Sequence, residues 1–150
     1  YHRDLKPHNV IIHPLRGPVL IDFGLAKAVA TGSDMSVTRG GSGTWSPPER
    51  DSGVSGPFTD VYSLGKILYF LLTSKVPQAI LGEEDKQDII TAGHPEWVAD
   101  LVLKATWPKY QQRLQSAAEL RGLLQQRGVT DSTQTQTSST VSSDDYTTWE

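Results

Sequence analysis

Two short runs of β-branched residues, Val10–Ile12 and Val19–Ile21, lie near the beginning of this 150-residue sequence. The six residues between the runs include two prolines and one glycine, which are typical of a turn, so the pattern predicts an antiparallel β-hairpin. In such a hairpin the start of the first strand faces the end of the second. Asn9 precedes the first run and Asp22 follows the second. We therefore expect the hairpin to bring these two side chains to the same end.

The loop before the hairpin adds ionisable groups to that end. Asp4 and Lys6 are two positions apart, and Asn9 closes the loop. The carboxylate of Asp22 and the amide oxygen of Asn9 suit a hard cation such as Mg²⁺. Proteins usually hold this ion with one or two side chains, and phosphate oxygens and water complete its coordination shell. Phosphoryl transfer is the chemistry that needs such a cation. The spacing therefore predicts a phosphoryl-transfer site at this end of the hairpin.

These residues resemble the eukaryotic-type protein kinases, in their Ser/Thr branch. The run His2–Asn9 (HRDLKPHN) matches the pattern HRDLKPxN, and Asp22–Gly24 (DFG) follows at the spacing of the family. The run Pro47–Glu49 (PPE) is similar to the family's Ala-Pro-Glu, with proline in place of alanine. The run Asp60–Gly65 (DVYSLG) resembles the opening of the family's central helix. By these four motifs, in the family's order, the chain is identified as a member of that family.

The resemblance covers residues 1–127 and implies a mainly α fold with a short β-hairpin, as in the C-terminal lobe of a protein kinase. Residues 128–150 are rich in Ser and Thr and poor in apolar residues, which predicts a disordered tail. The sequence given contains no Gly-rich phosphate loop and no lysine strand, both of which the family carries in its N-terminal lobe. We therefore expect that lobe to be supplied in cis by upstream sequence, and the segment by itself to be inactive.

Several helices are predicted in the part that resembles the lobe. Asp60–Thr73 is apolar on nearly every side, so we expect a central helix that is buried all round. Glu83–Asp88 is charged and is expected to face solvent. Pro95 suits the first turn of another helix. Ser116–Glu119 has the pattern of a capping box, and Gly128 is expected to end the helix that this box begins.

The resemblance implies a catalytic role for four residues of the loop and hairpin. Asp4 would orient the substrate hydroxyl and accept its proton, and Lys6 would neutralise charge on the transferring phosphoryl group. A lysine at this position accompanies Ser and Thr substrates in the family. Asn9 and Asp22 would hold the Mg²⁺ ions that bridge the phosphates of ATP. The expected reaction is transfer of the ATP γ-phosphoryl group to Ser or Thr hydroxyls of protein substrates.

Further residues would bind the nucleotide or support the site. Ile11 matches the apolar residue beneath the adenine ring in the family, and Ile21 directly precedes Asp22, so the expected ATP-binding set is Asn9, Ile11, Ile21 and Asp22. The resemblance also implies structural roles: His2 would stack on Phe23, Asp60 would anchor the backbone of the catalytic loop, and Glu49 would pair with Arg113. These three contacts are expected to hold the catalytic loop and the segment after it in place.

The segment between the hairpin and Glu49 is expected to be regulatory. Thr38 lies four residues before Ser42, the spacing at which many members of the family carry an activating phosphate. Arg3, beside Asp4, is the residue that would pair with that phosphate. Ser42 stands where the family commonly has threonine, and its hydroxyl would bridge Asp4 and Lys6.

Charge and composition exclude some functions and leave others open. The formal charge is −3, of which residues 128–150 carry −4, which leaves +1 for residues 1–127 and no basic field for nucleic acid. The absence of Cys excludes disulfides and Cys-based metal sites. No segment is long and apolar enough to span a membrane, and no signal peptide is present, so a cytoplasmic location is expected. A small-molecule kinase of the aminoglycoside or choline type, and a pseudokinase or interaction module, remain as alternatives.

Overall fold

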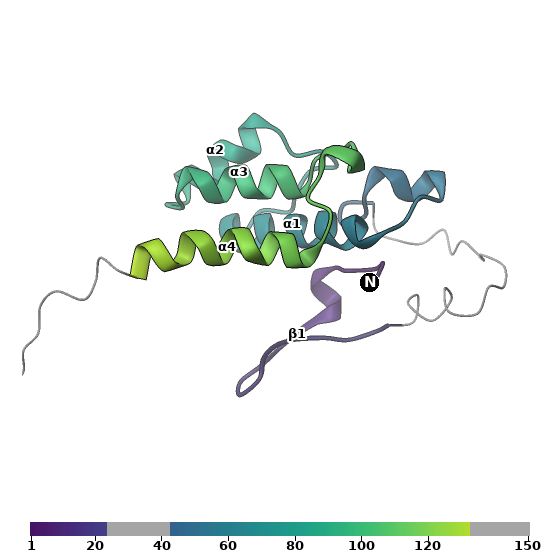
Figure 1. Cartoon of the computed structure of the whole chain (residues 1–150), viewed down its shortest axis with the longest axis horizontal. Coiled ribbons are helices and arrows are strands. Elements are labelled where there is room, and N and C mark those ends of the chain that lie inside the picture. Colours follow the sequence, from purple (N-terminus) through teal and green to yellow (C-terminus); the bar gives the residue numbers. More distant parts are fainter. Residues whose placement is uncertain (24–42, 133–150) are drawn as a thin grey trace, which may run out of the picture.

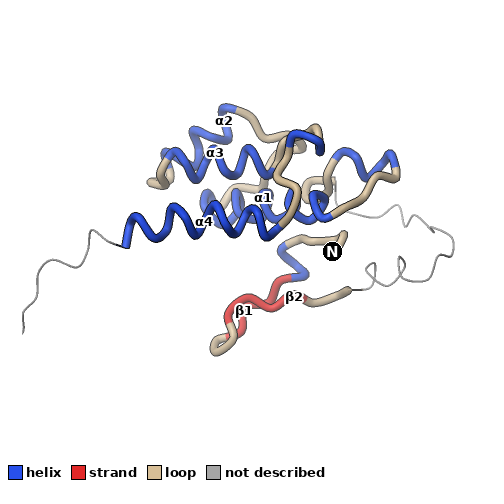
Figure 2. The backbone as a smooth tube through the Cα atoms, viewed as in Figure 1, coloured by secondary structure: helices blue, strands red, loops and turns tan. Residues whose placement is uncertain are grey.

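The computed structural model describes residues 1–23 and 43–132, and for residues 128–132 it describes the backbone alone. The described part is mainly helical, with one two-stranded antiparallel hairpin that extends away from the helices (Figures 1 and 2). The strands are β1 (Val10–His13) and β2 (Gly17–Leu20), and the helices are α1 (Pro57–Thr73), α2 (Glu83–Thr91), α3 (Glu96–Ala105) and α4 (Ala117–Ser132). Three short 3₁₀ helices, η1 (Pro7–Asn9), η3 (Pro48–Ser52) and η4 (Tyr110–Gln112), complete it. The predicted fold class is confirmed.

The hairpin forms where the two β-branched runs predict it. Val10 pairs with Leu20, and the ladder continues to His13 opposite Gly17, so the turn is shorter than the sequence suggested. Gly17 has a φ of +71°, a conformation that glycine adopts without steric cost. Beyond the ladder, the N–H of Ile21 donates to the carbonyl oxygen of Asn9 at 2.9 Å. The hairpin therefore brings the residue before β1 next to the residues after β2.

Helix α1 lies at the centre of the helical part and contacts α2, α3 and α4. Two groups of buried apolar side chains surround it. One joins α1 to α3 and α4 through Val61, Leu101, Ala105, Leu114 and Leu120, and the other joins α1 to α2 and α3 through Tyr69, Leu81, Ile89, Ala99 and Val102. The expectation of burial on all sides is wrong at the C-terminal end of the helix, where Leu71 is 69% exposed because no described element covers it.

The charged segment that begins α2 does not face solvent throughout, which corrects the expectation for Glu83–Asp88. Asp85 is buried, and its carboxylate accepts the N–H of Gly82 at 2.8 Å. This contact caps the first turn of α2 and satisfies a backbone donor that the helix itself leaves free. Ile89, one turn later, is fully buried beneath α1 and α3. The helix thus uses one carboxylate for capping and exposes Glu83 and Glu84.

Helix α4 begins close to the predicted capping box and ends later than predicted. The hydroxyl of Ser116 accepts the N–H of Glu119 at 3.1 Å, whereas the Glu119 carboxylate accepts the N–H of Gln115 at 2.8 Å. The helix continues through Gly128 to Ser132, so the expected end at Gly128 is wrong. A glycine inside a helix costs only about 1 kcal/mol relative to alanine, which is compatible with continuation. In the described part of the chain, no helix is long and apolar enough to cross a membrane.

Candidate active site

The loop before β1 is held against the N-terminal turn of α1 by Asp60. One carboxylate oxygen of Asp60 accepts the N–H of His2 at 2.5 Å, and the other accepts the N–H of Arg3 at 2.7 Å. Arg3 has a φ of +71°, which L-residues with long side chains rarely adopt. The two hydrogen bonds to a charged acceptor offset the cost of this conformation. The expected contact between Asp60 and the loop backbone is present.

Asp4 projects from this loop between two cations. Its Oδ2 lies 2.9 Å from Nζ of Lys6, and its Oδ1 lies 3.7 Å from Nη1 of Arg50. The direct contact with Lys6 was not expected, since Lys6 was predicted to face the transferring phosphoryl group and to meet Asp4 through the hydroxyl of Ser42. The second was missed, because Arg50 belongs to η3, 46 positions away, and no pattern in the sequence connects it with Asp4. The carboxylate therefore has one positively charged neighbour for each of its oxygens.

Asn9 is buried beside Asp4 and faces the end of the hairpin. Its Nδ2 donates to the main-chain oxygen of Asp4 at 2.8 Å, which leaves Oδ1 as the amide atom that can ligate a cation. Asp22 follows Ile21, whose N–H is bonded to Asn9, and Asp22 has a φ of +60°. One amide oxygen and one carboxylate fit Mg²⁺, which usually keeps several water or phosphate ligands. Residues 1–23 and 43–132 contain no group of three His, Cys, Asp or Glu side chains that could enclose a metal.

His2 links the end of β2 to the catalytic loop. Its ring lies 4.8 Å from the ring of Phe23, centroid to centroid, with a tilt of 52°. Nε2 of His2 is 3.0 Å from the carbonyl oxygen of Ile21, and Nδ1 accepts the N–H of Asp4 at 3.4 Å. A neutral ring with its proton on Nε2 satisfies both contacts. The structure therefore brings together the expected His2–Phe23 pair. It also bonds His2 to the backbone of Asp4 and of Ile21, the residue before Asp22.

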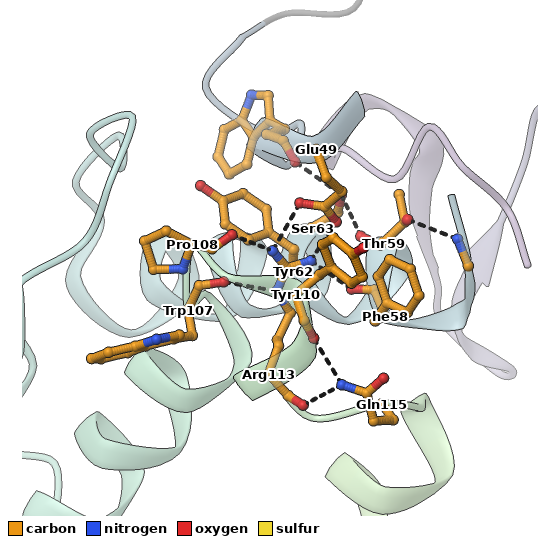
Figure 3. Close-up of polar contacts among 12 residues, drawn as sticks. Glu49, Phe58, Thr59, Tyr62, Ser63, Trp107, Pro108, Tyr110, Arg113 and Gln115 are labelled. Atoms are coloured by element: carbon orange, nitrogen blue, oxygen red, sulfur yellow. Dashed lines mark hydrogen bonds and ion pairs between the residues drawn. The ribbon is translucent and has the colours of Figure 1, made fainter. Parts of the chain in front are cut away.

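Glu49 and Arg113 form a buried ion pair under η3 (Figure 3). The guanidinium donates from Nη1 and Nη2 to the two carboxylate oxygens at 2.6 and 2.9 Å. It also donates to the carbonyl oxygens of Phe58, Trp107 and Pro108. Every side of the charge is therefore satisfied within the protein, as burial of an ion pair requires. The expected pairing of Glu49 with Arg113 is present in the structure.

Tyr62 lies over the same guanidinium, with its ring centroid 4.7 Å from Cζ of Arg113. Burial raises the pKa of Tyr62 to about 12, while the charge of Arg113 acts in the opposite direction. Its hydroxyl donates to the carbonyl oxygen of Ala79 at 2.8 Å. Tyr62 thus joins α1 both to the ion pair and to the segment before α2.

The apolar residues expected beneath a nucleotide are accessible. Ile11, in β1, is 50% exposed, and Ile21, directly after β2, is 37% exposed. Phe23, whose ring contacts His2, is also exposed. Ile11 pairs with Val19 in the ladder, and Ile21 lies two positions beyond Val19, beside Asn9 and Asp22.

The regulatory candidates are only partly within the described residues. Arg3 stacks on Tyr1 at 4.8 Å and donates to its hydroxyl at 2.9 Å, and its buried Nε has no hydrogen-bond partner among the described residues. Thr38 and Ser42 lie outside the described residues. Trp45, close to the start of the second described range, packs edge-on against Phe70 at 5.9 Å, and its carbonyl oxygen accepts the hydroxyl of Ser63.

Comparisons with known proteins show which proteins this chain is similar to. The Serine/threonine-protein kinase PknB of Mycobacterium tuberculosis is 36% identical over 135 residues, which is 80% of this chain and 22% of that protein. PknB of Mycobacterium leprae is 34% identical over 134 residues, with the same coverage. The Serine/threonine-protein kinase PknL of Mycobacterium tuberculosis is 42% identical over 78 residues, or 51% of this chain. The chain spans about a fifth of the length of these curated relatives. A family model described as "Protein kinase domain" matches residues 1–146, and the chain therefore belongs to the protein kinase domain family.

Proposed function

We propose that the protein containing this chain transfers the γ-phosphoryl group of ATP to Ser or Thr hydroxyls of other proteins. The observation that carries the proposal is the arrangement around Asp4. Its carboxylate is 2.9 Å from Lys6, and its main-chain oxygen is bonded to Asn9. The backbone on its N-terminal side is tied to Asp60. A base, a cation and a metal-ligating amide thus project from one anchored loop.

Each residue has a defined part in the reaction. The substrate hydroxyl oxygen forms a bond to the γ-phosphorus while the bond from that phosphorus to the β–γ bridging oxygen breaks, and ADP leaves. Asp4 accepts the proton of the hydroxyl, and Lys6 neutralises charge on the transferring group. Mg²⁺, held by Asn9 and Asp22, would supply charge neutralisation on the phosphates.

The nucleotide would bind on the side of the hairpin where Ile11 and Ile21 are accessible, and the substrate hydroxyl would approach Asp4. Ile11 and Ile21 would contact the adenine, since both are accessible and apolar. A floor of this kind holds ATP well only with a covering surface and a lysine for its phosphates, which relatives of this family carry in an N-terminal lobe. We propose that this lobe acts in cis with the present chain.

Arg3 supports a proposal for activation. Within the part of the chain that the structure describes, its buried Nε has no hydrogen-bond partner, and its guanidinium is held by Tyr1 two residues away. A phosphate on Thr38 would bring about −1.5 to −2 charges and three acceptor oxygens to such a group. The phosphorylated side chain of Thr38 would then be held by Arg3, next to Asp4.

The test uses the full-length protein that contains this chain, with Mg²⁺, ATP and casein as acceptor. We expect phosphoserine or phosphothreonine in casein, a loss of at least about a hundredfold in kcat for Asp4→Ala, and weaker nucleotide binding for Asp22→Ala. Transfer by Asp4→Ala at the wild-type rate would refute the assigned role. Transfer to aminoglycosides or choline, with none to proteins, would favour a small-molecule kinase. Nucleotide binding without any transfer would favour a pseudokinase.

A further inference from the structure

The backbone that carries Arg50 is fixed in place. Arg50 lies in η3, where its N–H donates to the carbonyl oxygen of Pro47 at 3.2 Å and its own carbonyl accepts the N–H of Gly53 at 3.1 Å. Its neighbour Glu49 is locked in the buried pair with Arg113. The side chain of Arg50 therefore starts from a point that is tied to the core of the helical part, and not from a free loop.

The side chain of Arg50 makes polar contacts with two residues in the described part of the chain. Nη1 donates to the hydroxyl of Ser46 at 2.9 Å and lies 3.7 Å from Oδ1 of Asp4. The side chains of Arg50 and Asp4 are 29% and 19% exposed, so solvent screens their attraction only in part. Lys6 contacts the other carboxylate oxygen, Oδ2.

The two distances indicate different kinds of interaction. At 2.9 Å Arg50 makes a hydrogen bond to Ser46, whereas 3.7 Å is too long for one to Asp4. The positive charge still attracts the carboxylate at that distance. Arg50 therefore holds Asp4 electrostatically and leaves the lone pairs of Oδ1 available to accept a hydroxyl proton. Ser46 in turn holds the guanidinium at this distance.

We infer that Arg50 is a positioning residue for Asp4. The inference rests on the proposed kinase function, in which Lys6 turns its charge toward the transferring phosphoryl group. When Lys6 does so, Asp4 loses its close neighbour on Oδ2, and Arg50 is the described cation that remains beside the carboxylate. Arg50 then keeps the carboxylate oriented toward the substrate hydroxyl. No motif of the sequence assigns this role to it.

The test separates a positioning role from a merely structural one. In the full-length protein with casein and Mg²⁺-ATP, we expect Arg50→Gln to lower kcat about tenfold, because a small misplacement of a reacting group slows chemistry strongly. KM for ATP should stay within about twofold of the wild-type value, because the polar contacts of Arg50 in the described part of the chain are with Ser46 and Asp4, neither of which is expected to bind ATP. Arg50→Lys keeps the positive charge and should retain most of the wild-type kcat. Arg121→Gln, an exposed arginine of α4, is the matched control and should behave as the wild type.

A second measurement does not depend on activity. The melting temperatures of Asp4→Asn, Arg50→Gln and the double variant form a cycle, and we expect the single effects not to add, since the two side chains interact. Wild-type kcat for Arg50→Gln in an active enzyme would overturn the inference while leaving the proposed function intact. Ser46→Ala removes the hydrogen bond that holds the guanidinium but keeps the charge of Arg50, so it should lower kcat less than Arg50→Gln does. A larger loss in Ser46→Ala than in Arg50→Gln would also overturn the inference, because Arg50 would then serve to hold Ser46. If the wild type transfers no phosphoryl group, the proposed function fails, and additive melting temperatures would separately refute the Asp4–Arg50 interaction.

Discussion

The carboxylate of Asp60, in the first turn of α1, accepts the backbone N–H of Arg3 at 2.7 Å, although the two residues are 57 positions apart. Its other oxygen accepts the N–H of His2. Because Arg3 is in the left-handed region, this contact supports a backbone conformation that the loop would not hold by itself. The orientation of Asp4, the next residue, therefore depends on the central helix.

Asp60→Asn should lower both stability and activity. Asparagine offers one acceptor oxygen in place of two, so one of the two N–H groups would face an amide NH₂ and stay unsatisfied. We expect a loss of about 2–3 kcal/mol in the free energy of unfolding of the full-length protein, measured with urea. Glu84→Gln, on the exposed face of α2, is the control and should change this free energy by about 0.5 kcal/mol or less. Equal effects of the two variants would contradict the anchoring role.

Arg113→Met should be strongly destabilising, because it leaves the Glu49 carboxylate buried without its partner. Breaking a buried pair in this way costs about 3–5 kcal/mol. Lys75→Met removes a comparable ion pair, that of Lys75 with Asp88 at 2.7 Å, but Lys75 is 59% exposed. An exposed pair contributes about 0–1 kcal/mol. Urea unfolding of both variants should show this difference, and similar losses would mean that burial does not decide the strength of the pair.

Lys66 should make stability depend on pH in the alkaline range. Its side chain is fully buried in α1, and its Nζ donates to the carbonyl oxygens of Gln78 and Ala79. Burial lowers the pKa of Lys66 to about 8, against which the charge of Asp85 acts. Between pH 8 and 10 the unfolded chain keeps this proton while the folded protein releases it, so stability must rise with pH.

The measurement compares the wild type with Lys66→Met, in which this titration is absent and the tyrosines are unchanged. From pH 7 to pH 10 the free energy of unfolding of the wild type should rise by about 1–3 kcal/mol relative to the variant. Above pH 10 the raised pKa of Tyr62 lowers the stability of both proteins, so the comparison ends at pH 10. A constant difference between the two curves from pH 7 to pH 10 would show that Lys66 keeps its proton in the folded state.

Gly65→Ala should destabilise the contact between α1 and α3. A Cβ at position 65 would lie 2.6 Å from Cγ2 of Thr106 and 3.0 Å from Cβ of Ala105. Thr106 cannot turn away without losing the hydrogen bond from its hydroxyl to the carbonyl oxygen of Val102. We expect a loss of about 1–3 kcal/mol, typical of overpacking.

Gly122→Ala is the matched control, since an added Cβ in α4 meets nothing within 4 Å. Alanine is the better helix former, so this variant should be stabilised by about 0.5–1 kcal/mol. The sign of the change in urea unfolding thus differs between the two substitutions. A stabilising effect at position 65 would refute the close approach of the two helices.

Local sequence determined a large part of this protein. The β-branched runs on either side of a Pro- and Gly-containing turn set up the hairpin, and apolar periodicity set up α1 and α3, because each depends on interactions between residues near in the chain. The loop of residues 2–9 could also be matched to a family motif, since that motif is contiguous. The end of α4 could not be predicted in this way. A single glycine costs a helix only about 1 kcal/mol relative to alanine, so Gly128 alone does not decide whether the helix stops.

Tertiary structure alone decided the contacts between distant segments. Arg50 reaches Asp4 because η3 is fixed by Glu49 and Arg113, and Lys66 is buried because two carbonyl groups before α2 accept its hydrogen bonds. In each case a polar side chain is satisfied by partners that the chain brings near only once it has folded. Sequence periodicity reports which residues avoid water, but it carries no information on which buried polar group will find which partner.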